Sequence, residues 1–192
     1  MRIEKLEVRE LKAPNWKFNR DMYFQVGEQW KWIDKRPWTD GQWEEYAADP
    51  ALRTFAGYCG DRVAGYFELH RTAPPSRGQR FAGANSTAGG RELFANRPRE
   101  AGVSVLGKTE TSQVTGQKDD EVEIAYFGLL PEFIGRGFGG ELLGRAIETA
   151  WGWSPTPSRV WVHTCNRDHP SALANYQARG FKIYKEVTGE GS

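Results

Sequence analysis

The sequence predicts an α/β fold in which a mixed β-sheet carries helices on both faces. Strand-like and helical runs follow one another in the order β, α, α, β, β, insertion, β, α, β, α, β. The second half contains a strand–helix–strand unit, an arrangement that forms a right-handed parallel crossover. A glycine-rich turn joins the first strand of that unit to its helix. With 192 residues and 21.7 kDa, residues 1–192 are expected to form a single domain.

The first elements are one strand and two helices. Apolar and polar residues alternate, with one slip, over Ile3–Leu11, which predicts a strand. Apolar residues at helical spacing predict a helix over Asn19–Ile33. A second, short helix is expected after Thr39 and Asp40, because such residues are common at helix starts.

An antiparallel hairpin and a long polar segment come next. Leu52–Cys59 and Val63–His70 are strand-like, and Gly60-Asp61-Arg62 between them is typical of a turn. Residues 72–120 are rich in Pro, Gly, Ser, Thr, Asn and Arg and are too polar for a core of their own. We interpret this segment as an insertion, mostly loop, with a possible small hairpin over Val103–Val114.

Hydrophobic periodicity returns in the last third of the chain. Leu142, Ala146 and Ala150 recur every four residues and form one apolar helix face. A second helix is expected in this region, because a proline lies near its start and a glycine lies just past its end. The predicted strands are Val122–Leu130, Arg159–Thr164 and Phe181–Val187. The predicted helices are Gly139–Trp151, between the first two strands, and 170–180, before the last.

Composition limits the classes of partner. Lys and Arg number 26 against 25 Asp and Glu, so the net charge of +1 provides no broad surface for nucleic acid or an acidic membrane. The sequence shows no long apolar run and no signal peptide, and Cys59 and Cys165 have no metal-ligand spacing. His163 and His169 lack a third ligand, so we interpret them as a strand and a turn residue. We expect a cytoplasmic protein without a metal, with buried, reduced thiols.

The glycine-rich turn indicates a ligand. Glycines at 135, 137, 139 and 140 precede or open the predicted helix. A helix start leaves four backbone N–H groups unpaired and carries partial positive charge, and glycine lets an anion approach the backbone closely. A phosphate-bearing cofactor is therefore expected at this turn.

Two segments carry a family resemblance. The runs EIAYFGLLPEFIGRGFGGELL and SALANYQARGF, at residues 123–143 and 171–181, resemble the GNAT family of N-acetyltransferases. The turn is similar to the pyrophosphate motif of that family, with Ile134 in place of the usual Gln or Arg, and Tyr176–Phe181 is similar to its Tyr-x-x-x-Gly-Phe motif. The resemblance implies transfer of an acetyl group from acetyl-CoA to a primary amine by direct attack in a ternary complex, and we expect that amine to belong to a small molecule.

The resemblance also implies where acetyl-CoA would bind. The pantetheine arm would lie along a strand edge and fill a gap that opens toward the next strand. The turn before the helix would hold the diphosphate, and Asn166 would begin the second motif, here in a longer turn. The implied cofactor-binding residues are Gly128, Leu129, Leu130, Gly135, Arg136, Gly137, Phe138, Gly139, Gly140 and Asn166.

Acetyl transfer to an amine requires a base, because an alkylammonium with a pKa of about 10.4 is charged at neutral pH. By resemblance, Glu123 occupies the position of a catalytic carboxylate, with Glu68 or a water molecule as the reserve. Tyr176 corresponds to the hydroxyl that meets the departing CoA sulfur. Either residue could instead be structural, with Glu123 satisfied by its neighbours and Tyr176 packed under the last helix.

Several alternatives stay open at this point. The acceptor could be a protein or peptide amine, or the chain could be a non-catalytic acyl-CoA sensor. Four tryptophans, Trp30, Trp32, Trp38 and Trp43, could pack in the core or hold a cationic amine by cation–π attraction. The last strand has no evident hairpin partner after Gly189, so a homodimer could cover its open edge.

Overall fold

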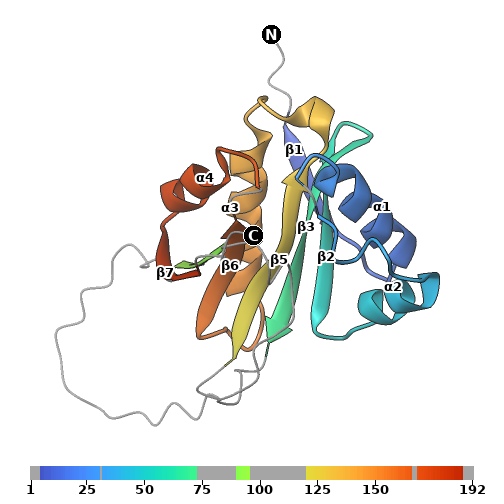
Figure 1. Cartoon of the computed structure of the whole chain (residues 1–192), viewed down its shortest axis with the longest axis horizontal. Coiled ribbons are helices and arrows are strands. Elements are labelled where there is room, and N and C mark those ends of the chain that lie inside the picture. The colour runs from blue at the N-terminus through green and yellow to red at the C-terminus, as the bar shows by residue number, and fades with distance from the viewer. Residues whose placement is uncertain (1–4, 31, 73–89, 96–119, 166–167, 188–192) are drawn as a thin grey trace, which may run out of the picture.

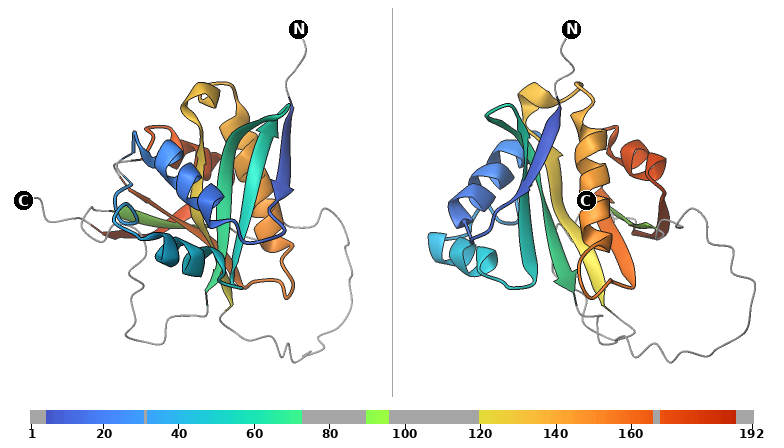
Figure 2. Two further views of the ribbon diagram at one scale, coloured as in Figure 1. Left: turned by 90° about the vertical axis from the view of Figure 1, so that its right-hand side faces the viewer. Right: turned by 180° about the vertical axis from the view of Figure 1, so that it is seen from behind.

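The computed structural model describes residues 5–30, 32–72, 90–95, 120–165 and 168–187. Its centre is a mixed sheet of seven strands in the order β1-β2-β3-β5-β6-β4-β7. Helices α1 and α2 cover one face of the sheet, and α3 and α4 lie on the other (Figures 1 and 2). The predicted mixed α/β architecture is confirmed.

Helix α1 spans Trp16–Gly27, so the prediction of Asn19–Ile33 is wrong at both ends. It begins early because the side chain of Asn15 caps it, accepting a hydrogen bond of 3.1 Å from the backbone N–H of Phe18. It ends early because the chain turns after Gly27, where the ring of Trp32 packs so closely that a Cβ would collide with it. The apolar spacing that suggested a longer helix therefore continues into irregular structure.

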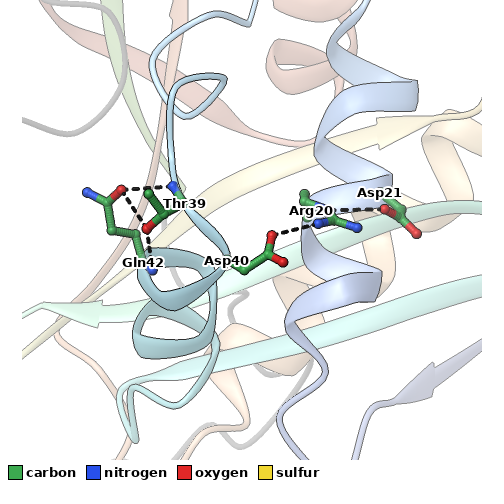
Figure 3. A network of polar contacts seen from close by, with 5 residues as sticks. All are labelled: Arg20, Asp21, Thr39, Asp40 and Gln42. Atoms are coloured by element: carbon green, nitrogen blue, oxygen red, sulfur yellow. Dashed lines mark hydrogen bonds and ion pairs between the residues drawn. The ribbon is translucent and has the colours of Figure 1, made fainter.

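Helix α2 spans Asp40–Ala47, as predicted from its cap. Thr39 and Gln42 form a capping box, in which each side chain accepts a hydrogen bond from the backbone N–H of the other (Figure 3). Asp40 in the first turn pairs with Arg20 of α1 at 2.9 Å, which ties the two helices together.

The hairpin and its neighbours form an antiparallel group of four strands at one side of the sheet. β1 (Leu6–Glu10) pairs with β2 (Leu52–Cys59), and β2 pairs with β3 (Arg62–Thr72) across the predicted turn. β3 pairs in turn with β5 (Glu121–Leu129). These four strands therefore lie side by side under α1 and α2.

The predicted crossover unit is also confirmed. A short 3₁₀ helix, η1 (Pro131–Phe133), follows β5 and leads to α3 (Phe138–Trp151). β6 (Arg159–Cys165) then runs parallel to β5. Buried side chains of α3 pack on the sheet, and they are Phe138, Leu142, Leu143, Ala146 and Ala150.

The C-terminal elements complete the second face and the sheet edge. α4 (Ala172–Ala178) is followed by β7 (Phe181–Val187), close to the predicted bounds. Gly180 between them has a φ of 85°, the left-handed conformation that glycine adopts readily. β7 pairs with β4, and the expected homodimer stays a prediction.

Strand β4 (Gly90–Ala95) was not predicted from the sequence. It comes from the segment interpreted as an insertion, and it lies antiparallel between β6 and β7. Leu93 is fully buried in the core, while Glu92 pairs with Lys185 of β7 at 3.0 Å. A polar segment thus supplies part of the sheet, and the hairpin expected at 103–114 lies outside the described residues.

Two smaller expectations concern membranes and thiols. Among the helices of the described part, none combines the length and the apolar character that crossing a bilayer requires. Cys59 and Cys165 lie at intermediate exposure, so the expectation that both thiols are buried is wrong. Each ends a strand, where the sheet no longer covers the side chain completely.

Candidate functional site

The two central parallel strands part halfway along their length. β5 and β6 pair through four residues each, from Glu121–Ile124 to Arg159–Val162. Opposite β3, Ala125 is an extra residue in β5, because Ile124 pairs with Leu69 and Tyr126 pairs with the residue before it, Glu68. Such a bulge bends its strand. The rest of β5 therefore separates from β6, and its backbone on that side faces a wedge.

A pocket of about 550 Å³ occupies this wedge. Its walls come from the second half of β5, the end of β6, the glycine turn before α3, helix α4 and the connection after α1. The described residues that line it include Trp30, Trp32, Asp34, Ile124, Ala125, Tyr126, Phe127, Gly128, Leu129, Ile134, Val162, His163, Cys165, Asp168, His169, Asn175 and Tyr176.

Helix α3 starts at this pocket without a side-chain cap. Its N-cap is Gly137, which has a φ of 85° and makes no side-chain hydrogen bond to the helix. Gly135 has a φ of 80°, and nothing lies within 4 Å of a Cβ built on either glycine. The unpaired N–H groups of the first helical turn, with their partial positive charge, are therefore accessible to an anion.

Most of the predicted cofactor residues lie on the pocket wall. Those from the strand edge and the glycine turn that line it are Gly128, Leu129, Gly135, Gly137, Gly139 and Gly140. This set combines an unpaired strand backbone with an uncapped helix start. The residues present thus fit a ligand that has a diphosphate at one end and an extended amide-containing arm.

Three predicted cofactor residues do not line the pocket, and one lies outside the described residues. Leu130 donates its backbone N–H to the carbonyl of Ala64 in β3, at 2.9 Å. Phe138 is buried under α3, and the guanidinium of Arg136 lies 5.3 Å from the centre of its ring. Asn166 falls in the part of the chain that the structure does not describe.

Glu123 lies just below the point where the strands part. It is half-buried and is not itself among the residues that line the pocket, although the next residue along β5, Ile124, is. Burial, with a smaller effect from Glu92, raises the pKa of Glu123 to about 7, while Lys35 opposes the rise. Within the described residues, its carboxylate forms no hydrogen bond or ion pair. This group is therefore poised to exchange a proton near neutral pH.

Glu68, the reserve candidate, has a different environment. Its side chain is 1% exposed and does not line the pocket. One carboxylate oxygen accepts a hydrogen bond of 2.8 Å from the side chain of Asn19, and the other accepts one from the hydroxyl of Tyr46. Burial raises its pKa. Both oxygens are engaged between α1, α2 and the sheet, which is a structural role.

Tyr176 lines the pocket and also packs in the core. Only 6% of the residue is exposed, and its ring lies 6.2 Å from that of Phe127 and 5.7 Å from that of Phe181. Burial raises the pKa of its phenol above the ordinary value of 10.0. The hydroxyl thus stays protonated at neutral pH and can donate a hydrogen bond.

Sequence analysis missed His163 as a pocket residue. β6 buries Val160, Val162 and Thr164 on one face and places the intervening residues on the other. His163 is the residue of this second set that lies just past the last pair with β5, and it lines the pocket. Burial lowers the pKa of its imidazole, so the neutral form dominates at pH 7. The alternation in RVWVHTC was the signal that could have identified it.

The connection after α1 forms the opposite wall. Asp34 accepts hydrogen bonds from the hydroxyls of Tyr23, at 2.6 Å, and Tyr126, at 3.0 Å, which fixes this connection against β5. The ring of Trp30 meets the edge of His169, from the segment after β6, at 5.1 Å. Both rings line the pocket, so two distant segments meet across it.

The tryptophans divide between core and pocket. Trp43 is 1% exposed and belongs to the core, whereas Trp30 and Trp32 line the pocket. The ring of Trp38 lies 3.7 Å from the side-chain nitrogen of Lys35. The cation held against this ring is therefore the protein's own Lys35.

No cluster of three metal-binding side chains occurs among the residues that the structure describes.

Residues 16–181 match the family model described as "Acetyltransferase (GNAT) family". The comparison with curated proteins gives no match.

Solved structures share the fold at low sequence identity. The aminoglycoside acetyltransferase AAC(6')-Iy, in complex with a CoA-linked acetylneamine bisubstrate analogue, is 14% identical, with a TM-score of 0.57 over 98% of each chain. An aminoglycoside acetyltransferase from an uncultured soil metagenomic sample, in complex with trehalose, is 10% identical, with a TM-score of 0.59 over 97% of this chain and 95% of its own. NAA60 of Arabidopsis thaliana, with a bisubstrate analogue, is 12% identical, with a TM-score of 0.55 over 94% and 86%.

Proposed function

The chain belongs to the GNAT acetyltransferase family, and from this premise we propose that it transfers an acetyl group from acetyl-CoA to a primary amine of a small molecule. One observation carries the proposal. The parted strands β5 and β6 and the uncapped start of α3 open into the same pocket. An extended arm and a diphosphate would thus find their binding groups in one continuous site.

Acetyl-CoA would supply a thioester, whose acetyl carbon is open to attack by an amine. The chain's own contribution is to hold this donor. Backbone N–H groups at Gly137–Gly140 would bind the diphosphate, where the helix start favours negative charge. The free backbone edge of Ala125–Leu129 would hydrogen-bond the pantetheine amides, as one more strand would. Tyr176 lines the same pocket and is the residue that we expect to meet the thioester sulfur.

The acceptor nitrogen must be neutral before it attacks. In the reaction, its lone pair forms a bond to the acetyl carbon, the carbon–sulfur bond breaks, and the amine loses a proton to a base. Glu123 suits this role, because a carboxylate with a pKa of about 7 is largely ionised just above neutrality and still basic. His163 is a second candidate, because it lines the pocket and its imidazole is neutral.

The departing thiolate needs stabilisation, which we assign to Tyr176. A phenol is a weaker acid than a thiol, at about 10 against about 8.5, and burial weakens this phenol further. Tyr176 therefore stabilises the sulfur by hydrogen bonding more than by full proton transfer. We predict that Tyr176→Phe lowers kcat about tenfold to a hundredfold, as loss of one hydrogen bond to a charged group would.

The control for Tyr176→Phe is the affinity for acetyl-CoA. Calorimetry should give the same Kd for the variant and the wild type, because the phenyl ring keeps its packing against Phe127 and Phe181. Equal turnover in the two proteins would show that the hydroxyl takes no part in the reaction.

The meeting of Trp30 and His169 across the pocket supports a compact acceptor over an extended peptide. Two measurements test the proposed function. Acetyl-CoA should raise the melting temperature, and release of free CoA thiol should then be followed with a panel of small amines and with peptides. Turnover on peptides alone would contradict the small-molecule acceptor, and acetyl-CoA binding without any turnover would contradict the enzyme.

A further inference from the structure

Arg179, the residue that follows α4, lies against the first turn of α3. Its Nε donates a hydrogen bond of 2.8 Å to the backbone carbonyl of Gly140, which is 39 residues away in the sequence. Its Nη1 donates one of 2.6 Å to the side-chain oxygen of Asn175, a pocket residue on α4. Two separate elements thus hold the guanidinium in a fixed orientation.

The guanidinium packs directly on Gly140. A Cβ built on this glycine would lie 1.9 Å from Nη2 of Arg179, a distance that no real side chain tolerates. Glycine at 140 is therefore needed for this close approach. Nη2 has no hydrogen-bond acceptor among the described residues, so both of its N–H groups remain available at a glycine that lines the pocket.

Charge makes this arrangement unfavourable without a ligand. The start of α3 is electropositive, and Arg179 adds a full positive charge beside it. Within the described part of the chain, no carboxylate pairs with Arg179. Glu141 lies in the first turn of α3, but it is exposed and forms no ion pair there. Two positive groups side by side, with unused donors, are the features of an anion site.

The glycine turn itself supplies no cationic side chain to the pocket wall. Ile134, at the start of the turn, lines the pocket with an apolar side chain. The guanidinium of Arg136 lies over the rings of Phe133 and Phe138, at 5.2 Å and 5.3 Å, and is not on the wall. Arg179 is not part of the wall either, but it is hydrogen-bonded to two residues that are, Gly140 and Asn175.

We propose that Arg179 binds the diphosphate of the acyl donor, with Nη2 hydrogen-bonded to a phosphate oxygen beside the N–H groups of α3. This inference rests on the proposed function and adds a specificity-determining residue to it. The planar guanidinium suits phosphate oxygens, and its preformed hydrogen bonds to Gly140 and Asn175 hold it in place before the donor arrives.

Arg179→Met removes the charge and keeps much of the apolar stem. Binding is measured by calorimetry and transfer by thiol release, each with acetyl-CoA, with its 3′-dephospho form and with acetyl-pantetheine, which lacks the diphosphate. We expect Kd and KM to rise about tenfold to a hundredfold for both nucleotide donors, because one charge-assisted contact is lost. For acetyl-pantetheine we expect a change of less than about twofold.

Arg145→Met is the matched control. Arg145 lies on α3, the helix against which Arg179 packs, pairs with Glu148 at 3.2 Å and does not line the pocket, so its loss removes an equal charge from another position. The affinities for all three donors should stay at the wild-type values. An equal loss in both variants would mean that only net charge matters, which would overturn the assignment to Arg179.

A second substitution displaces Arg179 without removing its charge. Gly140→Ala puts a methyl group 1.9 Å from Nη2, while Gly144→Ala adds the same methyl group to α3 where no described residue lies within 4 Å. Only Gly140→Ala should weaken binding of the nucleotide donors. Unchanged affinity in Gly140→Ala would contradict the proposal.

The remaining outcomes separate this inference from the proposed function. If wild-type protein binds none of the donors, the proposed function fails. If wild-type protein binds acetyl-CoA and Arg179→Met binds it equally well, the inference alone fails. A loss confined to acetyl-CoA, absent with the 3′-dephospho form, would assign Arg179 to the 3′-phosphate and overturn the diphosphate contact. An equal loss with acetyl-pantetheine would show that Arg179 only supports the packing of α4 on α3.

Discussion

At the starts of α2 and α3, the backbone N–H groups of the first turn lack partners within the helix, and the two helices differ in what surrounds these groups. At α2 the capping box of Thr39 and Gln42 satisfies the backbone N–H groups, and Asp40 places negative charge at the positive end of the helix (Figure 3). At α3 the cap is Gly137, which offers no side chain, and the cation of Arg179 is hydrogen-bonded to the backbone carbonyl of Gly140 in the first turn. A helix start that the chain leaves open, and that faces a pocket, indicates a ligand site.

Two carboxylates extend the comparison to the sheet. Glu68 lies in the core with both oxygens hydrogen-bonded, to Asn19 and Tyr46. Glu123, on the neighbouring strand, has no such partner within the described residues, and burial raises its pKa to about 7. Both acids lie on the face of the sheet that α1 and α2 cover, because Glu123 pairs with His70, two residues after Glu68. One carboxylate is thus satisfied by its neighbours, whereas the other is available for chemistry.

The largest expected effect tests this difference between the carboxylates. Glu123→Gln should lower the rate of acetyl transfer about 10²- to 10⁴-fold, because a general base contributes that much, and should leave the Kd of acetyl-CoA unchanged. The measurement is single-turnover transfer with a saturating amine. If His163 is the base instead, Glu123→Gln will keep most of its rate and His163→Gln will lose it.

Glu68→Ala is the matched variant for that experiment. It should cost about 2–4 kcal/mol of unfolding free energy, because it leaves a cavity and deprives Asn19 and Tyr46 of their acceptor. Activity per folded molecule should stay within a few-fold of wild type. A folded but inactive Glu68→Ala protein would reverse the roles that we assign to the two acids.

The second effect is a pH dependence of stability. The folded-state pKa of Glu123, about 7, lies above its ordinary value of 4.5. The contribution of Glu123 to the free energy of unfolding is therefore fully present below about pH 4.5. It is lost as the pH rises through 7, because folding then confines a charge in a half-buried position. Discounted for partial exposure, the loss is about 1–3 kcal/mol.

Urea unfolding of wild type and Glu123→Gln at pH 5 and pH 8 measures this loss. The glutamine variant carries no titrating group at this position, so its stability should exceed that of wild type at pH 8 and approach it at pH 5. An equal difference at both pH values would show that Glu123 titrates normally and is no candidate base.

The smallest effect tests the two helix starts directly. Thr39→Ala should cost about 1 kcal/mol of unfolding free energy, since it removes the cap of α2, with no change in the affinity for acetyl-CoA. Gly137→Ala should cost a similar amount, about 1–2 kcal/mol, because its φ of 85° strains any other residue, and it should also weaken acetyl-CoA binding. Thermal unfolding and calorimetry separate the two outcomes. Weakened binding in Thr39→Ala would remove the contrast between the helices.

Local patterns predicted much of the fold. The hairpin β2–β3 followed from its turn, α2 from its cap, and the β5–α3–β6 unit from periodicity and glycine placement, all within a residue or two. Local patterns did not predict strand β4 or the end of α1. β4 has only three apolar residues in a row, Leu93–Ala95, within a polar segment, and it is a strand because β6 and β7 pair with it. α1 ends where the packing of Trp32 turns the chain.

The sequence by itself determined that α3 begins on glycines with no capping side chain, because a missing side chain is a local property of the residues there. Only the tertiary structure decided what surrounds that start. The parting of β5 from β6, the raised pKa of Glu123 and the place of Arg179 each depend on segments far apart in the chain. Burial and charge act between such segments, and they exist only once the chain has folded.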